Sequence, residues 1–162
     1  MISSSQLFMV RRALDKDLPF VVEINRHELP ENYSPHFFKD MLDNHGEFFF
    51  VAEAQDKIVG YVMCRKEVDF SPFLGYPSLS PRGHVVSLAV RSTHRRMGIG
   101  VSLMLAAHEA MRSAGLKESY LEVRIDNSPA VELYKRIGYE VNKTISSYYL
   151  DGTSAHLMVL RL

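Results

Sequence analysis

The stretch that decides the fold is Val86-Ser-Leu-Ala-Val-Arg-Ser-Thr-His-Arg-Arg-Met-Gly-Ile-Gly-Val101. Its apolar start predicts a strand, its arginine-rich middle predicts a loop, and its glycines precede an amphipathic helix. The backbone N–H groups at a helix N-terminus have no partner within the helix and carry partial positive charge, so they attract phosphate. Glycines let a phosphate approach the backbone, and Arg95 and Arg96 add positive charge beside it. The stretch therefore predicts a loop that binds phosphate groups.

Three kinds of phosphate-binding loop compete for this interpretation. A Walker loop ends in Gly-Lys-Ser or Gly-Lys-Thr, which is absent here. The dinucleotide fingerprint needs a third small residue three positions after Gly100, where Leu103 stands. What remains is the pattern Arg95-x-x-Gly98-x-Gly100. The plain alternative is a helix start with a glycine-rich cap and two solvated arginines.

Outward from this loop, hydrophobic periodicity predicts one α/β domain over residues 1–162, ordered strand, two helices, three strands, helix, strand, helix, two strands. The expected strands are Leu7–Arg12, Phe48–Ala54, Ile58–Glu67, His84–Val90, Ser119–Arg124, Tyr139–Tyr149 and Ala155–Leu160. The expected helices are one capped by Asp15 that runs through Ile24, one that opens at Ser34-Pro35, one over Val101–Ala114, and one that opens at Ser128-Pro129. The third should bury Val101, Met104, Leu105, His108 and Met111. Residues 68–83 are rich in Pro and Gly, and long loops of this kind are often binding loops or lids.

The bulk composition is that of an ordinary globular domain. Of the 162 residues, 46% are apolar and 23% are charged, and 19 Lys and Arg balance 19 Asp and Glu. The balanced charge gives no general argument for binding nucleic acid or a membrane, and we expect neither as a partner. No signal peptide and no apolar run long enough to span a bilayer is apparent. The single cysteine, Cys64, excludes a disulfide within the chain and fits a cytoplasmic protein.

Several motifs together resemble the GNAT acetyltransferase superfamily. The phosphate loop resembles that family's pyrophosphate loop, and Leu88-Ala89-Val90 resembles the strand that pairs with the pantetheine arm. The second half is similar in Leu121-Glu-Val-Arg124, Asn127-Ser128, Ala130, Leu133-Tyr134 and Gly138-Tyr139. The resemblance covers about Val10 to Leu160 and implies a seven-stranded mixed, splayed sheet flanked by about four helices.

Two further segments resemble the N-terminal protein acetyltransferase branch, which contains RimI-like enzymes and the catalytic subunit of the eukaryotic NatA complex. Leu29-Pro-Glu-Asn-Tyr33 resembles the substrate loop of NatA-type enzymes. Tyr148-Tyr149-x-Asp151-Gly152 resembles the C-terminal hairpin that closes over the bound peptide. The resemblance implies transfer of acetyl from acetyl-coenzyme A directly to the α-amine of a protein or peptide N-terminus, with ribosomal proteins among the candidate acceptors and ribosome association as one arrangement. The chain is expected to be a monomer or a homodimer.

The resemblance also implies roles for individual residues. The expected contacts to acetyl-coenzyme A are Leu88, Ala89, Val90, Arg95, Arg96, Met97, Gly98, Ile99, Gly100, Val101, Asn127 and Tyr134. Among these, the Val90 N–H would polarise the thioester carbonyl. Peptide contacts are expected from Glu31, Tyr33, Tyr148 and Tyr149.

The catalytic residues implied are Glu122, Tyr134 and Glu31. Glu122 would accept the amine proton, Glu31 would share that role or hold the N-terminal ammonium, and Tyr134 would donate a proton to the departing thiolate. NatA-type subunits often carry histidine where Glu122 stands, whereas RimI-like proteins carry glutamate, so either Glu122 or Glu31 can be the base. Each residue also has a plainer interpretation: Glu122 on a solvent face, Glu31 as a helix-terminus acid, Tyr134 in the core, and the paired tyrosines in strand pairing.

Other interpretations stay open at this point. The acceptor can be a lysine or a small-molecule amine, or the chain can bind coenzyme A as a sensor without turnover. A misread nucleotide-binding module is a further alternative. An α-amine with a pKa near 8 is about one tenth neutral at pH 7, whereas a lysine is neutral in well under a thousandth of molecules, which favours N-termini. His84 next to Glu122 could hold a zinc ion, but two ligands are too few for a structural site, so we expect no metal.

Overall fold

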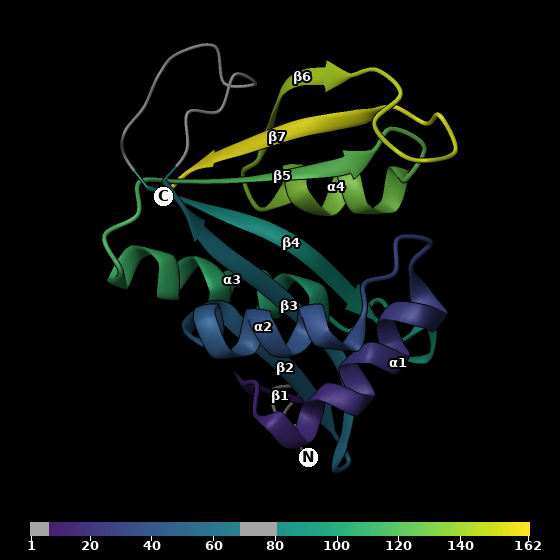
Figure 1. Cartoon of the computed structure of the whole chain (residues 1–162), viewed down its shortest axis with the longest axis vertical. Helices are drawn as coiled ribbons and strands as arrows, with labels where there is room; N and C mark the ends of the chain where they lie inside the picture. Colours follow the sequence, from purple (N-terminus) through teal and green to yellow (C-terminus); the bar gives the residue numbers. More distant parts are fainter. Residues whose placement is uncertain (1–6, 69–80) are drawn as a thin grey trace. The chain divides into compact units, whose positions relative to one another are not determined.

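The computed structural model describes residues 7–68 and 81–162, so the expectation of a binding loop or lid at 68–83 lies largely outside the described residues. Seven strands follow the sheet order β1-β2-β3-β4-β5-β7-β6 (Figure 1). The strands are β1 (Met9–Arg12), β2 (Phe49–Ala54), β3 (Lys57–Glu67), β4 (Arg82–Val90), β5 (Glu118–Arg124), β6 (Glu140–Ile145) and β7 (Ala155–Arg161). The α-helices are α1 (Leu18–Glu28), α2 (Pro35–His45), α3 (Ile99–Ser113) and α4 (Ser128–Arg136). Short 3₁₀ turns cover Asp15–Asp17, Gly46–Phe48 and Ser92–His94.

The sheet is mixed, as expected. β1 with β2, β2 with β3, β5 with β7, and β6 with β7 pair antiparallel, whereas β4 and β5 pair parallel. The parallel ladder pairs Gly83 with Ser119 and His84 with Tyr120. The predicted element order and fold class are therefore confirmed. The described residues form two compact units, 7–65 with 86–110, and 66–68 with 81–85 and 111–162. The expectation of one domain over residues 1–162 stays a prediction.

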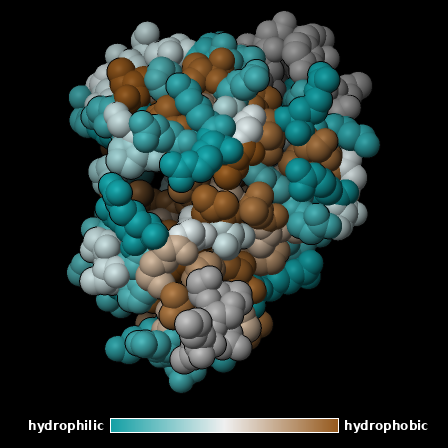
Figure 2. Space-filling view, turned by 180° about the vertical axis from the view of Figure 1, so that it is seen from behind, coloured by the Kyte–Doolittle hydropathy of each residue, from teal (hydrophilic) through white to brown (hydrophobic). Residues whose placement is uncertain are grey.

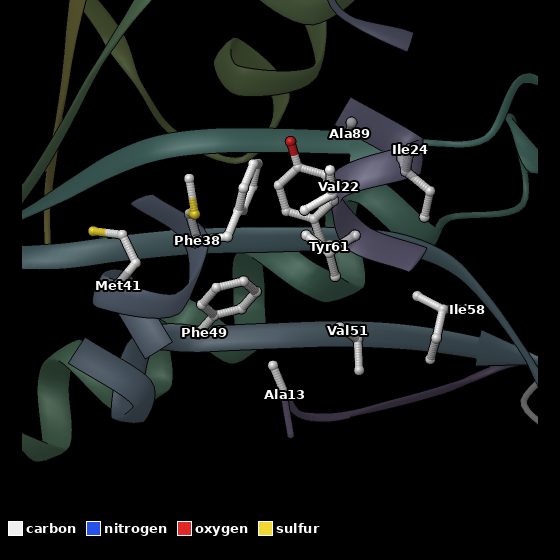
Figure 3. Close-up of a cluster of buried hydrophobic side chains, with 12 residues drawn as sticks. Ala13, Val22, Ile24, Phe38, Met41, Phe49, Val51, Ile58, Tyr61 and Ala89 are labelled. Carbon is white, nitrogen blue, oxygen red and sulfur yellow. The ribbon is translucent and has the colours of Figure 1, made fainter. Parts of the chain in front are cut away.

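In the first unit, α1 and α2 pack against β2 and β3 through a buried apolar cluster (Figure 3). Phe38 and Met41 of α2 and Ile24 of α1 are almost fully buried in it. Side chains alternate between faces along a strand, so Tyr61 of β3 enters this cluster while Gly60 faces the other way. A Cβ at Gly60 would lie 3.1 Å from the Ala89 carbonyl oxygen and 3.3 Å from Leu103 Cδ1, so glycine allows α3 and β4 to approach β3 closely.

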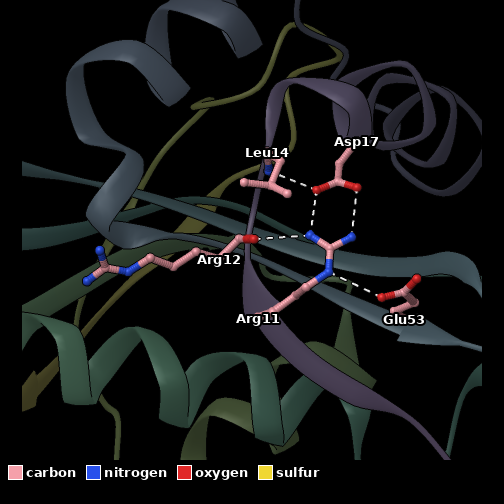
Figure 4. A network of polar contacts seen from close by, with 5 residues as sticks. All are labelled: Arg11, Arg12, Leu14, Asp17 and Glu53. Atoms are coloured by element: carbon pink, nitrogen blue, oxygen red, sulfur yellow. Dashed lines mark hydrogen bonds and ion pairs between the residues drawn. The ribbon is translucent and has the colours of Figure 1, made fainter.

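The start of α1 differs from the expectation. Asp15 lies in a 3₁₀ turn and α1 begins at Leu18, so the predicted Asp15 cap is wrong. The carboxylate of Asp17 accepts hydrogen bonds from Arg11 at 2.7 and 2.9 Å and from the Leu14 N–H at 2.8 Å (Figure 4). Burial by itself would raise the pKa of Asp17, but the bonds from Arg11 and Leu14 lower it overall. Arg11 also donates to Glu53, so this ion-pair network ties α1 to β1 and β2.

Other helix boundaries follow local signals that the sequence carries. The Ser34 hydroxyl accepts from the Phe37 N–H at 3.2 Å, which confirms the predicted cap of α2. Gly115 and Gly138 follow α3 and α4 with φ of +81° and +110°, as expected of helix-ending glycines. Leu105 is 51% exposed, so its assignment to the buried stripe of α3 was wrong, whereas Met104, His108 and Met111 are buried.

In the second unit, β7 lies between β5 and β6, and α4 supplies Tyr134 to the interior. A Cβ at Gly83 would lie 2.4 Å from Met111 Sδ, so no side chain fits at this position of β4. The last part of the chain is shorter in strand than expected. β6 ends at Ile145, so the predicted strand Tyr139–Tyr149 was too long, and Tyr148 and Tyr149 lie in the connection to β7.

The surface carries polar and apolar side chains interspersed on the face seen in Figure 2. Scattered apolar side chains of this kind are normal on a protein surface. Among residues 7–68 and 81–162, no helix combines the length and the apolar character that crossing a bilayer requires.

Candidate active site

The predicted phosphate loop links β4 to α3 in the first unit. The Arg96 backbone has φ of +62° and that of Gly98 has φ of +82°, and a left-handed conformation is unusual for an arginine. The first backbone bond of α3 runs from the Ser102 N–H to the Gly98 oxygen at 3.0 Å. The N–H groups of residues 99–101 therefore lie ahead of the helical ladder, where an anion can accept from them. Residues 95–98 are exposed.

The arginine at the start of this loop is held by a glutamate that the sequence patterns did not single out. Arg95 Nη2 lies 2.7 Å from Glu28 Oε2, and the Ser92 N–H donates to Glu28 Oε1 at 3.1 Å. Glu28 is the last residue of α1, so it joins the end of α1 to the loop. The Arg95 side chain remains 57% exposed, so it stays accessible to a second anion.

The segment Leu29–Tyr33, predicted to bind the acceptor, follows α1 directly. Asn25 is fully buried, and its side chain holds the segment by donating to the Glu31 oxygen and accepting from the Tyr33 N–H, both at 3.2 Å. The ring of Tyr33 stacks on Phe37 with 4.8 Å between centroids. The structure thus gives Glu31 and Tyr33 one shared backbone support.

The most strongly polar cluster of the second unit surrounds His84 on β4. Its Nε2 lies 2.7 Å from Glu122 Oε2 and its Nδ1 lies 2.9 Å from Glu67 Oε1. The Tyr120 ring stacks on the imidazole with centroids 4.4 Å apart, and the Tyr120 hydroxyl donates to Glu67. We call Glu67, His84, Tyr120 and Glu122 the imidazole cluster. Glu122 therefore has a partly buried, hydrogen-bonded position instead of a freely solvated one.

Two carboxylates on one ring change its charge. Burial would lower the pKa of His84, but hydrogen bonds to Glu122 and Glu67 raise it, to about 9. His84 is therefore mainly a cation at neutral pH. A cation between two carboxylates can pass protons from one side of the cluster to the other.

Sequence reasoning paired His84 with Glu122 only as a weak metal site and missed Glu67. Glu67 ends β3, and its one available signal was a carboxylate at the end of a strand, which is too common to be informative. Within the described part of the chain, no group of three or more His, Cys, Asp or Glu has the arrangement for holding a metal ion. Cys64 is buried, and burial raises the pKa of its thiol, so it is a poor nucleophile.

The helix α4 contributes two of the predicted residues. The Asn127 side chain caps α4 by accepting from the Ala130 N–H at 3.3 Å. Tyr134 is buried, and its ring meets that of Tyr139 edge to face at 5.9 Å. Its predicted role as an acid stays a prediction, as does the contact of Asn127 with the donor.

The predicted peptide-closing segment follows β6. Tyr148 and Tyr149 meet edge to face at 4.9 Å, and the Arg124 guanidinium lies 4.7 Å from the centre of the Tyr149 ring. Arg124 also pairs with Asp151 and donates to Thr153 Oγ1 at 2.8 Å. A backbone bond from Thr153 and the Arg124 pair lower the pKa of Asp151 to about 2. The predicted turn is confirmed at Gly152, whose φ is +87°.

Taken by unit, the structure divides the predicted residues into two sets. Those in the first unit are Glu31, Tyr33, Leu88, Ala89, Val90 and residues 95–101. Those in the second unit are His84, Glu122, Asn127, Tyr134, Tyr148 and Tyr149. Tyr120, Glu122 and Arg124 alternate along β5 and so share one face of that strand, which links the imidazole cluster to the tyrosine turn.

Comparison with known proteins gives a consistent result. The family model described as "Acetyltransferase (GNAT) family" matches residues 18–139. An "N-alpha-acetyltransferase" from Sulfurisphaera tokodaii is 44% identical over 156 residues, covering 96% of this chain and 93% of that protein. The N-terminal acetyltransferase A complex catalytic subunit NAA10 of Arabidopsis thaliana is 36% identical, covering 92% of this chain and 75% of that protein.

Solved structures agree with the sequence comparison. Ard1 from Thermoplasma volcanium superposes with a TM-score of 0.85 at 27% identity, covering 96% of this chain and 98% of that one. Chaetomium thermophilum Naa20, solved with a bisubstrate analogue, gives 0.85 at 29% identity, covering 95% of this chain and 86% of that one. The motifs, the strand order and these matches converge, and the chain belongs to the GNAT acetyltransferase family.

Proposed function

We propose that this chain transfers the acetyl group of acetyl-coenzyme A to the α-amine of protein N-termini. The observation that carries the proposal is the Glu122–His84 pair, a base with a proton-carrying neighbour, in a chain 44% identical to a protein named N-alpha-acetyltransferase. Relatives at 41% and 42% identity carry the same name. Direct transfer needs an amine nucleophile, a base and an acid, and the chain supplies candidates for the last two.

The donor is proposed to bind along β4 and the phosphate loop. Leu88, Ala89 and Val90 would pair with the pantetheine arm, and the Val90 N–H would polarise the thioester carbonyl. The diphosphate would accept from the N–H groups of residues 99–101 and pair with the exposed Arg95. The left-handed backbone of Arg96 supports this role, because this conformation is unfavourable for a residue with a side chain and such residues are concentrated at functional sites.

Glu122 is proposed as the general base. The ammonium of an acceptor must lose a proton before it can attack, and Glu122 with His84 offers a pair that can take that proton directly or through water. Glu31 is the alternative base or a holder of the N-terminal ammonium. The hydrogen bond between Glu122 and His84 favours Glu122, since the protonated His84 also bonds Glu67 and can donate a proton to Glu67 as it takes one from Glu122.

Tyr134 is proposed as the acid that protonates the departing thiolate. Its side chain is buried on α4, and a phenol hydroxyl can donate a proton. Tyr33, Tyr148 and Tyr149 are proposed to line the peptide, where flat aromatic surfaces suit a short extended chain. Ribosomal proteins as acceptors, a cytoplasmic location, and a monomeric or homodimeric state belong to the same proposal.

The proposal is tested with a library of synthetic peptides incubated with acetyl-coenzyme A and read by mass spectrometry. Free N-termini should gain 42 Da, the mass of one acetyl group, whereas matched peptides with a blocked N-terminus and an internal lysine should not. Acetylation of the blocked peptides, or of a polyamine alone, would identify a lysine or small-molecule acetyltransferase. Tight coenzyme A binding in calorimetry without acetylation of any amine would identify a sensor.

A further inference from the structure

A chain of neutral polar groups crosses the apolar cluster of the first unit. Asn25 Nδ2 donates to the Tyr61 hydroxyl at 3.1 Å, and that hydroxyl lies 2.7 Å from Ser87 Oγ. Asn25 and Tyr61 are fully buried and Ser87 nearly so. Figure 3 shows the Tyr61 ring among the apolar side chains, with its hydroxyl drawn at the tip. These three residues, which we call the buried polar chain, connect α1, β3 and β4.

The Asn25 amide uses all of its hydrogen-bonding groups in this chain and in the bonds to residues 31–33. The Asn25 amide has two donor hydrogens, and these serve the Tyr61 hydroxyl and the Glu31 oxygen. The Tyr61 hydroxyl accepts from Asn25, and either hydroxyl can be the donor in its bond with Ser87. The remaining amide oxygen of Asn25 accepts from the Tyr33 N–H at 3.2 Å. The amide is thus fully used, and reversing it would place its oxygen against the Glu31 oxygen and its NH2 group against the Tyr33 N–H.

The buried polar chain costs free energy that an apolar core would not. Removing amides and hydroxyls from water is unfavourable unless every group is paired, and even paired groups gain little over apolar side chains of similar shape. Burial raises the pKa of Tyr61 to about 12, so the hydroxyl stays neutral and cannot serve as a base at neutral pH. Within the buried polar chain, the Asn25 amide holds the backbone at both Glu31 and Tyr33.

We infer that Asn25 and Tyr61 are positioning residues that set the selectivity of the enzyme for the first residue of its acceptor. They hold the backbone of residues 31–33 rigid, and the side chains of Glu31 and Tyr33 project from that backbone. A pocket wall that cannot shift discriminates between side chains, whereas a mobile wall adapts to each. The inference rests on the proposed function, in which Glu31 and Tyr33 contact the acceptor.

The test compares Asn25→Asp and Tyr61→Phe with a control, Val51→Ala, in the same apolar cluster. Asn25→Asp keeps the shape but removes both donor hydrogens, and Tyr61→Phe removes only the hydroxyl. Val51 is fully buried on β2, so its truncation lowers the melting temperature without removing a polar bond to the loop. The measurements are kcat and KM for peptides that differ in their first residue, and the Kd of acetyl-coenzyme A.

We expect the peptide KM to rise about tenfold in Asn25→Asp, because this variant loses the direct bond from position 25 to the Glu31 oxygen. We expect a rise of about threefold in Tyr61→Phe, because this variant keeps both bonds of Asn25 to residues 31–33 and removes only the hydroxyl that supports the amide. Discrimination between preferred and poor first residues should narrow in both variants. The kcat at saturating peptide and the donor Kd should stay within about twofold, as should all constants of Val51→Ala. Unchanged peptide KM and selectivity in Tyr61→Phe would overturn the inference, and so would a matching change in Val51→Ala. Tyr61→Phe alone decides the question if Asn25→Asp fails to fold.

Hydrogen exchange separates this inference from the proposed function. In Asn25→Asp a side-chain oxygen can still accept from the Tyr33 N–H, but the bond to the Glu31 oxygen is lost and the backbone of residues 31–33 is held less firmly. The Tyr33 amide should therefore exchange faster in Asn25→Asp and at the wild-type rate in Val51→Ala. Wild-type protein that acetylates no peptide would refute the proposed function and with it the selectivity role. Wild-type activity with unchanged Tyr33 exchange in Asn25→Asp would refute the positioning role alone.

Discussion

The imidazole cluster and the buried polar chain are two polar networks built on opposite principles. The imidazole cluster holds a cation between two carboxylates, and its members keep partial access to solvent. The buried polar chain holds only neutral groups and is closed to solvent. Charged groups near solvent can exchange protons, whereas neutral groups with every bond satisfied can only fix geometry. Whether the groups of a network can gain or lose protons, and not the number of its hydrogen bonds, therefore separates a proton-transfer role from a positioning role.

The largest expected effect is at the charged network. Glu122→Gln keeps a side chain able to bond with His84 but removes the base, so kcat on a peptide should fall about 10²- to 10³-fold. Glu140→Gln, an exposed carboxylate on the edge strand β6, is the matched control and should keep wild-type kcat. Wild-type turnover in Glu122→Gln would indicate that Glu31 is the base, and the imidazole cluster would then have no catalytic role.

A second effect concerns pH. His84 has a pKa of about 9, so below that pH it is mainly protonated and Glu122 beside it is a weaker base. The kcat/KM should therefore rise as pH increases through about 9. Glu67→Gln removes one carboxylate that favours the cation, so the pKa of His84 falls and the rise moves to lower pH. The α-amine of the peptide, which has a pKa near 8, then limits the rise in kcat/KM, so the rise should occur about one pH unit lower than in the wild type.

The control for this shift keeps both carboxylates. Tyr120→Phe removes the hydroxyl that bonds Glu67 and leaves Glu67 and Glu122 in place, so the rise should stay near pH 9. Arg82 of β4 and Glu118 of β5 form an ion pair at 3.5 Å on the same two strands as His84 and Glu122, and both remain in every variant. A profile of Glu67→Gln that matches the wild type would show that His84 does not limit the rate.

The buried polar chain should show a smaller effect on peptide KM, and this effect should not depend on pH. The expected threefold rise in peptide KM for Tyr61→Phe should be about the same at pH 6.5 and pH 9.5, because Tyr61 is neutral throughout that range. Peptide KM measured at both values for wild type and variant gives the ratio directly. A ratio that changes with pH would mean that the buried polar chain is linked to a titrating group.

The smallest effect is expected at a surface ion pair that belongs to neither network. Glu28 and Arg95 are charged, but Arg95 is more than half exposed, and exposed pairs contribute about 0–1 kcal/mol. Glu28→Gln keeps a side-chain acceptor for the Ser92 N–H, so the Kd of acetyl-coenzyme A should change by about twofold, which corresponds to the middle of that range. Calorimetry at low and high salt measures it. A tenfold change would show that Glu28 controls donor binding.

Much of the fold and part of the site could be predicted from sequence. The hairpin of β2 and β3, the Ser34 cap and the helix-ending glycines follow from neighbours a few residues apart, and these predictions are confirmed. The predicted Asp15 cap was the exception. The nearby Asp17 instead bonds to Arg11, and Arg11 also bonds to Glu53, which is 42 residues away in sequence. Tertiary pairing there decided which acid sits at the helix start.

The site shows the same division more sharply. The phosphate loop and Glu122 could be recognised because their motifs are continuous in sequence. Glu67 could not, since it reaches His84 across 17 residues and Tyr120 across 53. Asn25 reaches Tyr61 across 36 residues, and no local pattern distinguishes such an asparagine from one on a surface.

The amino-acid sequence alone determined the strand–loop–helix unit around Arg95 and the GNAT family of this chain, because backbone preferences and contiguous motifs act over short distances. Only the tertiary structure decided which side chains share a proton at His84 and which hold residues 31–33 in place. Those pairings depend on strands and helices that meet after folding, and the free energy of a buried charge or amide is set by its neighbours in space.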